Sequence, residues 1–393
     1  MDEKSGLLTK AAARDESEEE RNINYAFHLF KVIGFSYLFT CFALVQPVDY
    51  WRQIFPTVSA EFEISWTYNL ASVATLLVLV ESGMAPSYVK RVVGAYAVIV
   101  LFMVILTASH FVLASQMTKL AAVLGCTAVI SIAISALDST VLSLASLFPL
   151  GAMHHTQVGV GIASFVSALC RVATKAFFPP DSIVESTMLF FGLAIVNLAA
   201  GLLAFFLLLR LPVTQHCIHD VAKAQVIDHA VCSKIWFKAA MVAISFGCTY
   251  VLYPSVLSMP SYSYPWLNAN EWWPLILTML YAGCEVIGRW CVQWRLATHE
   301  TIWMAVAPRL LLIPLLVLRV KWHWLPHDTF SLLWVVLLGT SHGYCGTLAV
   351  VVMNDSVEAH EQSVTGMIAS LAINMGILGG STLRLLASFL PEA

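Results

Sequence analysis

The stretch VVGAYAVIVLFMVILTASHFVLASQMT, residues 92–118, decides the fold class of this chain. It runs for 27 residues without Asp, Glu, Lys or Arg. Because about 20 apolar residues cross a bilayer as a helix, this stretch is long enough to span a membrane once. The whole chain of 393 residues has the same character, since only 11% of its residues are charged, against about 25% in average soluble domains. The sequence therefore predicts an integral membrane protein.

The same length rule predicts further spans on both sides of this stretch. The expected spans cover residues 32–51, 64–82, 92–114, 120–148, 156–177, 186–209, 235–258, 273–294, 301–318, 329–353 and 363–390. Strands are not expected, because closed barrels use segments of about ten alternating residues, whereas these runs are long and apolar on every face. The predicted fold is an all-α integral membrane protein of eleven transmembrane helices.

Polar segments divide the chain. Residues 1–31 contain seven acids before residue 24 and no apolar core, so we expect a disordered acidic cytoplasmic tail. The longest internal polar segment, 210–234, follows the sixth span and is expected to be a cytoplasmic loop. It separates a predicted six-helix bundle over 32–209 from a predicted five-helix bundle over 235–390.

The basic residues predict the orientation. An odd number of spans places the termini on opposite sides of the membrane, and twelve Lys and Arg fall on the side of the N-terminus against five on the other. Since cytoplasmic loops carry the excess of Lys and Arg, the N-terminus is predicted to be cytoplasmic and the C-terminus external.

The net charge of −3 excludes a broad basic surface, so no nucleic acid partner is expected.

Few ionisable side chains lie inside the expected spans, where each costs at least about 2.5–3.5 kcal/mol. Glu285 and Arg289 are four residues apart on one helical face, so they can pair, and the competing interpretation is an ion pair that only locks helix packing. Asp138 has no basic residue within a turn. It must find a partner across the bundle, become protonated or meet a cationic ligand. For three arginines nearer to span ends, helix capping, lipid contact or packing is favoured: Arg171, Arg309 and Arg384.

These residues sit in motifs that resemble the equilibrative nucleoside transporter family (solute carrier family 29-like). The strongest match is Glu285-Val-Ile-Gly-Arg289, followed by Ala307-Pro-Arg309-Leu-Leu-Leu-Ile-Pro314. Ser341-His342-Gly343-Tyr344 looks like the family's Ser-Asn-Gly-Tyr, and Gln157-Val-Gly-Val-Gly161 fits as well. The resemblance covers all but the tail and the cytoplasmic loop.

Two departures from the family pattern bear on the substrate. Thr40-Cys41-Phe42 stands where the family's first helix usually carries Pro-Trp-Asn, so a contact to the nucleobase is missing or moved to Phe42. Asp138 stands where many members have a Gln.

The resemblance implies a major-facilitator-like arrangement of six and five helices, with a ligand site between the bundles near the midplane. It also implies transport of purine nucleosides or nucleobases by alternating access, either facilitative or proton-coupled. Arg289 would donate to ribose hydroxyls or to a base acceptor, Glu285 would orient Arg289, and Asp138 would accept from an exocyclic amine or a ring N–H. The predicted substrate-binding set is completed by stacking surfaces and two polar residues: Phe42, Trp66 or Tyr68, Gln157 and His342.

Alternatives remain open from the sequence. The same fold could carry an organic cation such as choline, with Asp138 as the counter-charge. A proton could be coupled through Asp138, Glu285 or His342. An enzyme is not expected, because Ser341 and His342 are neighbours on a helix and point about 100° apart, so they cannot act as a dyad.

The remaining expectations concern partners and location. No cofactor and no metal site are expected. The expected partners are the small-molecule substrate, the lipid bilayer and, for proton-coupled transport, a proton, and the protein is expected to be a monomer. The expected location is the plasma membrane. Glu3-Lys-Ser-Gly-Leu7-Leu8 resembles an acidic dileucine sorting signal, which leaves an endosomal or vacuolar membrane as the alternative.

Overall fold

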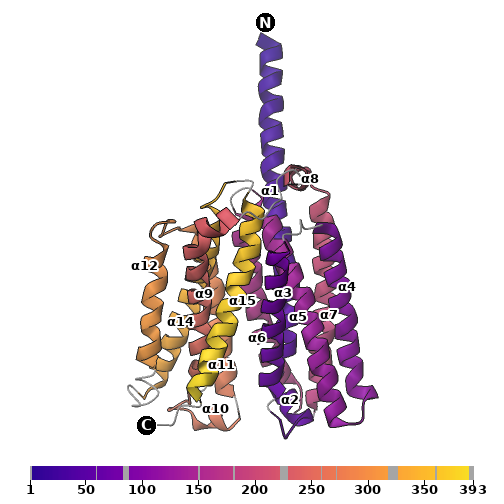
Figure 1. Ribbon diagram of the computed structural model, residues 1–393, viewed down its shortest axis with the longest axis vertical. Coiled ribbons are helices and arrows are strands. Elements are labelled where there is room, and N and C mark those ends of the chain that lie inside the picture. The colour runs from indigo at the N-terminus through magenta and orange to yellow at the C-terminus, as the bar shows by residue number, and fades with distance from the viewer. Residues whose placement is uncertain are drawn as a thin grey trace.

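The computed structural model describes ten stretches of the chain, residues 2–58, 60–82, 88–148, 151–179, 182–221, 229–257, 259–270, 272–316, 326–358 and 361–388. Side chains are not described for residues 1–17, 218–230, 254 and 387–388. Within these stretches the regular structure is entirely helical. Figure 1 shows the helices running side by side in one bundle, with the start of α1 projecting beyond it.

In chain order the long helices are α1 (Asp2–Val45), α3 (Ala60–Glu81), α4 (Tyr88–Val112), α5 (Gln116–Ser146), α6 (Ala152–Phe177), α7 (Ile183–Leu209), α9 (His229–Leu257), α11 (Trp272–Trp290), α14 (Asp328–Asn354) and α15 (Gln362–Ser388). Shorter helices join them: α2 (Val48–Ile54), α8 (Pro212–Val221), α10 (Pro265–Ala269), η2 (Cys291–Gln293), α12 (Ile302–Val306) and η3 (Ala307–Leu311).

Ten helices of the described chain are long and apolar enough to cross a membrane, and they coincide with ten of the predicted spans. The predicted span 301–318 corresponds to a shorter apolar helix, Ile302–Leu316, which tightens into the 3₁₀ segment η3. Pro308 lies in η3, and proline lacks the N–H that an α-helix uses. An all-helical, multi-pass architecture is therefore confirmed, and the count of eleven stays a prediction.

The start of the chain differs from the sequence-based expectation in two ways. The first predicted span, 32–51, is helical only to Val45, because Pro47 interrupts it and α2 then begins at Val48. The tail over 1–31, predicted to be disordered, is helical from Asp2 onward. Its sequence is rich in Ala, Glu, Lys and Leu, which are strong helix formers, and Arg21 lies 3.7 Å from Glu18 one turn away.

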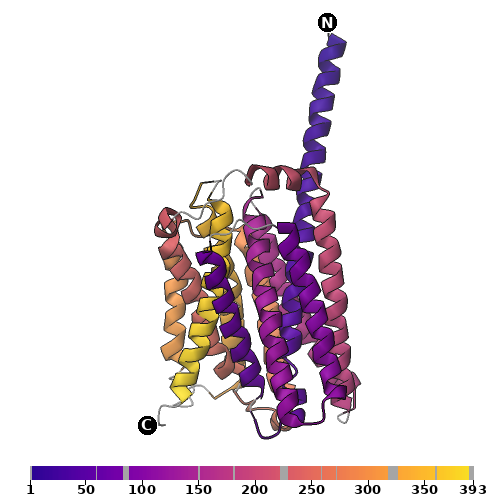
Figure 2. The same ribbon diagram turned by 45° about the vertical axis from the view of Figure 1, so that its right-hand side comes forward.

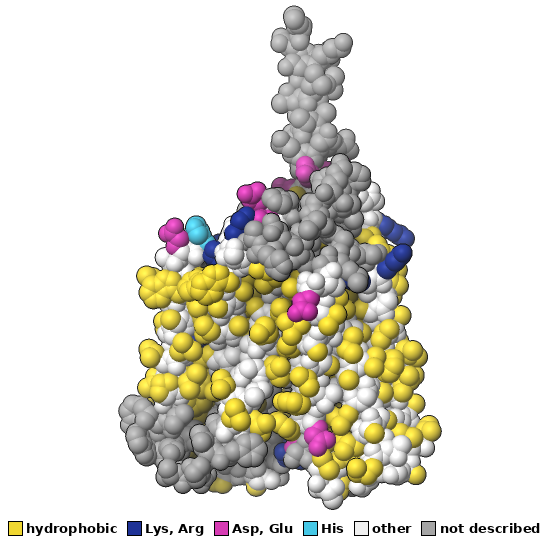
Figure 3. Space-filling model, in the orientation of Figure 1, with side chains coloured by type: hydrophobic (Ala, Val, Ile, Leu, Met, Phe, Trp, Pro, Cys, Tyr) yellow, Lys and Arg dark blue, Asp and Glu magenta, His cyan; other side chains and the backbone are white. Residues whose placement is uncertain are grey.

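The outside of the bundle is apolar, as lipid contact requires. Large hydrophobic side chains such as Leu101, Val196 and Leu203 are more than half exposed. On the face seen in Figure 3, hydrophobic side chains cover most of the sides, and most of the charged side chains lie near the two ends. Helices suit this setting because all their backbone hydrogen bonds are made within the segment.

We call α1–α7 the N-terminal half and α9–α15 the C-terminal half. Within the N-terminal half, α1 packs on α6 and α7, and within the C-terminal half, α9 packs on α15 and α11 on α14. The halves meet where α5 contacts α15 and α6 contacts α11, and Figure 2 shows α15 beside the N-terminal half. The ends of the described chain, Asp2 and Ser388, lie at opposite ends of the bundle (Figures 1 and 2).

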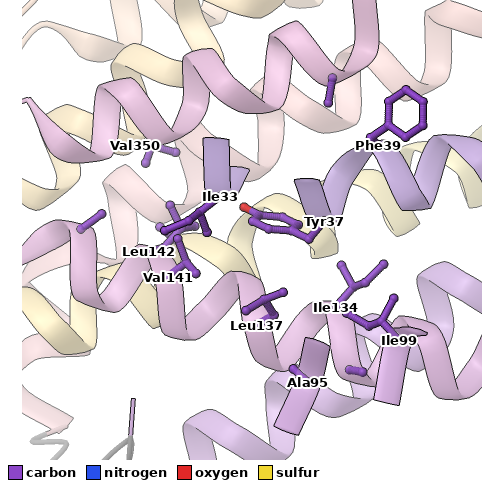
Figure 4. Packing of buried hydrophobic residues seen from close by; sticks show 14 of the residues in the cluster. Ile33, Tyr37, Phe39, Ala95, Ile99, Ile134, Leu137, Val141, Leu142 and Val350 are labelled. Atoms are coloured by element: carbon purple, nitrogen blue, oxygen red, sulfur yellow. The ribbon is translucent and has the colours of Figure 1, made fainter. Parts of the chain in front are cut away.

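The core of the N-terminal half is built around α1. Figure 4 shows Tyr37 among aliphatic side chains, including Ile33 of α1 and Ile134 and Leu137 of α5. These side chains are 3% exposed or less. A buried tyrosine needs a hydrogen-bond partner for its hydroxyl, and the Tyr37 hydroxyl donates to Asp138.

Candidate functional site

A cavity lies inside the bundle between the two halves. Helices α1, α3, α5 and α6 line it from one half, and α9, α11, α14 and α15 line it from the other. Its volume is about 170 Å³, more than ten times the roughly 10–15 Å³ that one water molecule needs, so a small organic molecule has room. Seven of the eight predicted site residues line it: Phe42, Tyr68, Asp138, Gln157, Glu285, Arg289 and His342.

Trp66, the eighth predicted residue, does not line the cavity. Its side chain is 39% exposed, whereas Tyr68, two residues later, is 8% exposed and lines the cavity. Residues two apart on a helix point about 200° apart, so only one of the two can face the interior. Of the two residues predicted as alternatives for stacking, only Tyr68 lines the cavity, as Phe42 does.

Asp138 is held by two hydroxyl donors from different helices. Tyr37 of α1 donates to Oδ1 at 2.6 Å, and Ser370 of α15 donates to Oδ2. Across the described stretches, no Lys, Arg or His lies within ion-pair distance of this carboxylate. Of the three possibilities that the sequence leaves open, the structure has partners across the bundle, and both partners are neutral.

Arg289 and Glu285 form the buried pair that the sequence predicts. Arg289 donates to Oε1 of Glu285 from Nε at 3.1 Å and from Nη2 at 2.6 Å. Its Nη1 donates to Oε1 of Gln157 at 2.5 Å and to Oγ1 of Thr347 at 3.4 Å. Both charged side chains are buried. Because Gln157 belongs to α6, the Arg289 guanidinium joins the two halves of the protein.

Motif glycines make room for this pair. A Cβ at Gly161 would lie 2.7 Å from Cδ of Arg289. A Cβ at Gly343 would lie 2.1 Å from the backbone oxygen of Glu285, and one at Gly288 would lie 2.3 Å from the backbone oxygen of Thr340. Small residues of this kind let membrane helices approach closely, so α14 presses against the turn of α11 that carries the pair.

Arg309 belongs to the site more closely than its sequence position indicates. It is 3% exposed and lies in η3, in the middle of Ile302–Leu316. Its Nη1 donates to the carbonyl and hydroxyl of Ser245, both at 2.6 Å, and its Nη2 donates to Thr249 at 2.6 Å. Thr249 in turn lies 2.9 Å from Nδ1 of His342, a cavity residue. The expectation of lipid contact is therefore corrected, whereas the expectation of packing between helices agrees with these bonds.

Arg171 behaves as the sequence suggests. It pairs with Asp49 at 2.5 Å and is not among the residues that line the cavity. Among the described residues, no group of three or more His, Cys, Asp or Glu side chains could hold a metal ion.

The halves are hydrogen-bonded to each other at the end of the bundle from which α1 projects. There Ser143 lies 2.7 Å from Ser363 of α15, and Asn354 donates to the carbonyl of Ser146 at 3.4 Å. A second cavity of about 500 Å³ lies at the same end and is lined in part by Asn354 and Gln362. These contacts therefore lie between the two halves beside the second cavity.

Comparison with known proteins agrees with the motifs. The model of the family described as "Nucleoside transporter" matches residues 217–389. Equilibrative nucleotide transporter 8 of Arabidopsis thaliana is 21% identical over 379 residues, which cover 94% of this chain and 96% of that protein. Nucleoside transporter 1 of Crithidia fasciculata is 23% identical over 129 residues, covering 31% of this chain and 26% of that protein.

Solved structures share the fold. The major facilitator superfamily transporter FucP in its outward conformation has a TM-score of 0.59 at 14% identity, and covers 92% of this chain and 91% of its own. The proton:xylose symporter XylE has a TM-score of 0.60 at 11% identity, covering 94% and 90%. The predicted major-facilitator-like fold is confirmed. The matches do not favour the organic cation alternative.

Proposed function

Because the chain belongs to the equilibrative nucleoside transporter family, we propose that it moves purine nucleosides or nucleobases across a membrane by alternating access, either facilitatively or coupled to a proton. One observation carries the proposal. The cavity between the two halves contains a guanidinium, Arg289, that is fixed from both halves, and it shares this cavity with Asp138 and several aromatic rings.

Arg289 has a donor to offer a substrate. A guanidinium has five N–H groups, and in the structure four hydrogen bonds run from Arg289 to Glu285, Gln157 and Thr347. The second N–H of Nη2 is then available to a ribose hydroxyl or to an acceptor on the base. Glu285 orients the guanidinium and balances its charge, which a buried ion requires.

The other polar end of the cavity accepts hydrogen bonds. Asp138 supplies carboxylate oxygens for an exocyclic amine or a ring N–H, while Phe42 and Tyr68 supply rings for stacking against a base. A neutral, flat molecule with a hydroxylated end matches this combination. Alternating access then requires the halves to rock around the cavity, which would break the hydrogen bonds between them at the end from which α1 projects.

The test is uptake into proteoliposomes of labelled adenosine, inosine and hypoxanthine. Arg289→Ala should lower uptake of each by more than tenfold, because an orienting donor is lost and the Glu285 charge is left unpaired. Arg52→Ala is the matched control, since the Arg52 side chain is 62% exposed and does not line the cavity. Unchanged uptake in Arg289→Ala would refute the proposed role.

Coupling and location need separate measurements. If transport is coupled to a proton, uptake should collapse when a protonophore is added, whereas facilitative uptake should be unchanged.

We propose the plasma membrane as the location. Imaging a Leu7→Ala/Leu8→Ala variant tests the endosomal or vacuolar alternative, because loss of a working sorting signal would move the protein to the cell surface.

A further inference from the structure

We propose that Asp138 makes the site selective for the guanine ring, through two adjacent N–H donors that bind the two oxygens of one carboxylate. This inference rests on the proposed function and names the base that the same cavity prefers. It begins from the surroundings of Asp138, which are neutral donors only in the described part of the chain.

The Asp138 carboxylate keeps half of its acceptor capacity. An ionised carboxylate offers about four acceptor positions on its two oxygens. Tyr37 occupies one position on Oδ1 and Ser370 occupies one on Oδ2, so each oxygen retains one. Asp138 lines the cavity and is only partly buried, which leaves these remaining positions to a molecule inside it.

The carboxylate is also fixed in orientation. Tyr37 lies in α1 and Ser370 in α15, so the two hydroxyls hold the two oxygens from different halves. Asn374, one turn after Ser370, donates to the carbonyl of Ser370 at 2.9 Å and accepts from Ser72 of α3 at 2.8 Å. A side chain held by such a network loses little rotational freedom on binding, which favours recognition of one donor pattern.

The edges of the purine bases differ in the pattern that a carboxylate reads. Guanine presents two neighbouring donors, the ring N1–H and the 2-amino group. Hypoxanthine presents N1–H beside a carbonyl, and adenine presents its 6-amino group beside the bare N1, so each places an acceptor next to a donor. Two parallel charge-assisted bonds form only with guanine. In the same pose hypoxanthine places only C2–H opposite the second carboxylate oxygen, and adenine places its N1 acceptor there. An unpaired polar group of this kind gives strong discrimination.

An amide at the same position would read a different pattern. Asn or Gln presents one acceptor and one donor side by side, which matches the amino and N1 edge of adenine and the N1–H and carbonyl edge that hypoxanthine and guanine share. Against the N1–H and 2-amino edge of guanine, the amide opposes one donor to another. The exchange of one side-chain group at position 138 should therefore abolish the preference for guanine over hypoxanthine.

Competition binding on the purified full chain tests this, with guanosine, inosine, adenosine and 2-aminoadenosine as competitors. Guanosine and inosine differ only in the 2-amino group, and guanosine should bind at least about tenfold more tightly, a difference of roughly 1.4 kcal/mol. 2-Aminoadenosine keeps the 2-amino group but lacks N1–H, so it should bind more weakly than guanosine.

Two variants distinguish recognition of the base by the Asp138 carboxylate from a general loss of binding. Asp138→Asn should abolish the preference, so that guanosine binds no more tightly than inosine. Ser370→Ala removes one hydroxyl donor and leaves both Asp138 oxygens in place, so it should weaken binding of all four compounds and keep guanosine first. If Asp138→Asn does not fold, the ratios of the parent protein and of Ser370→Ala still decide.

The outcomes are distinguishable. Equal binding of guanosine and inosine by the parent, with binding of both lost in Arg289→Ala, would overturn this inference and leave the proposed function standing. An unchanged order in Asp138→Asn would overturn it as well. If none of the four compounds binds, both the inference and the proposed function fail.

Discussion

Ser146, in the last turn of α5, donates a hydrogen bond to the backbone carbonyl of Gln362 at the start of α15, across 2.7 Å. A turn earlier in α5, Ser143 lies 2.7 Å from Ser363, and Tyr88 of α4 lies 3.1 Å from the same hydroxyl. These contacts join the halves at the end of the bundle from which α1 projects. Neutral hydrogen bonds of this kind contribute only about 0.5–1.5 kcal/mol each, so they can hold one end closed and still break during a transport cycle.

The first prediction concerns this closure. Replacing both Ser143 and Ser363 by Ala should favour the form open at the end from which α1 projects by about 1–2 kcal/mol, or roughly 5- to 30-fold in population. The apparent affinity for substrate should then fall on the opposite side, as measured by uptake and efflux in oriented proteoliposomes. Ser186→Ala is the control, because Ser186 bonds within its own helix to Ile183. Identical values on both sides would contradict the prediction.

The second prediction concerns the crossing of α11 and α14. Gly343→Ala places a Cβ where the backbone oxygen of Glu285 lies 2.1 Å away, so the helices must separate and the Glu285–Arg289 pair must move. We expect poor folding and loss of uptake, measured by the monodispersity of the purified protein and by transport. Gly94→Ala adds the same methyl group to a helix where nothing lies within 4 Å, and it should behave like the parent.

The third prediction concerns Asp328, at the start of α14, whose hydrogen bonds hold residues 261–263, in the segment after α9. Its carboxylate accepts from the backbone N–H of Tyr262 at 2.6 Å and of Ser263 at 3.1 Å, and from the hydroxyl of Ser261 at 2.9 Å. Asp328→Ala leaves these donors without that acceptor and should cost about 2–4 kcal/mol.

The apparent melting temperature of purified Asp328→Ala should therefore fall by several degrees. Glu300→Gln is the control, since that side chain is 80% exposed and lies 3.7 Å from His299. A melting temperature equal to that of the parent would show that the segment holds its place without Asp328.

The fourth prediction concerns topology. If Ile302–Leu316 crosses the membrane with the ten longer helices, the chain has an odd number of spans. An epitope tag at the N-terminus should then react with antibody only after the cells are permeabilised, and a tag at the C-terminus should react on intact cells. Two tags with the same behaviour would mean an even number of spans.

The sequence predicts those parts of the fold and the site that depend on local spacing. Spans follow from runs of apolar residues, and the pairing of Glu285 with Arg289 follows from four residues on one helix. Tyr37 and Ser370, in contrast, meet Asp138 across 101 and 232 residues of sequence, and no local pattern marks them. Hydroxyl and amide side chains inside apolar helices, such as Ser370 and Asn374 one turn apart, are the nearest available signal.

Other differences have identifiable physical causes. A window of apolar residues runs through Pro47, although proline ends the helix there. Acidic composition indicates disorder in the tail, but the same residues are good helix formers. Arg309 lies within the Ala307-Pro-Arg309 motif and donates to Thr249, which lines the cavity. Membership of the motif therefore predicts its position better than its distance from the end of a span.

The charges at the centre of the protein have an electrical consequence. When both carboxylates are ionised, Asp138 and Glu285 carry two negative charges that balance the two positive charges of Arg289 and Arg309, so the side chains in and directly behind the cavity sum to zero. A membrane voltage does work of about 2.3 kcal/mol per elementary charge for each 100 mV. With a balanced centre and a neutral nucleoside as cargo, neither the loaded nor the empty protein would move net charge as it reorients. Facilitative transport would then be electrically silent, whereas coupling to a proton or carriage of an organic cation would generate a current.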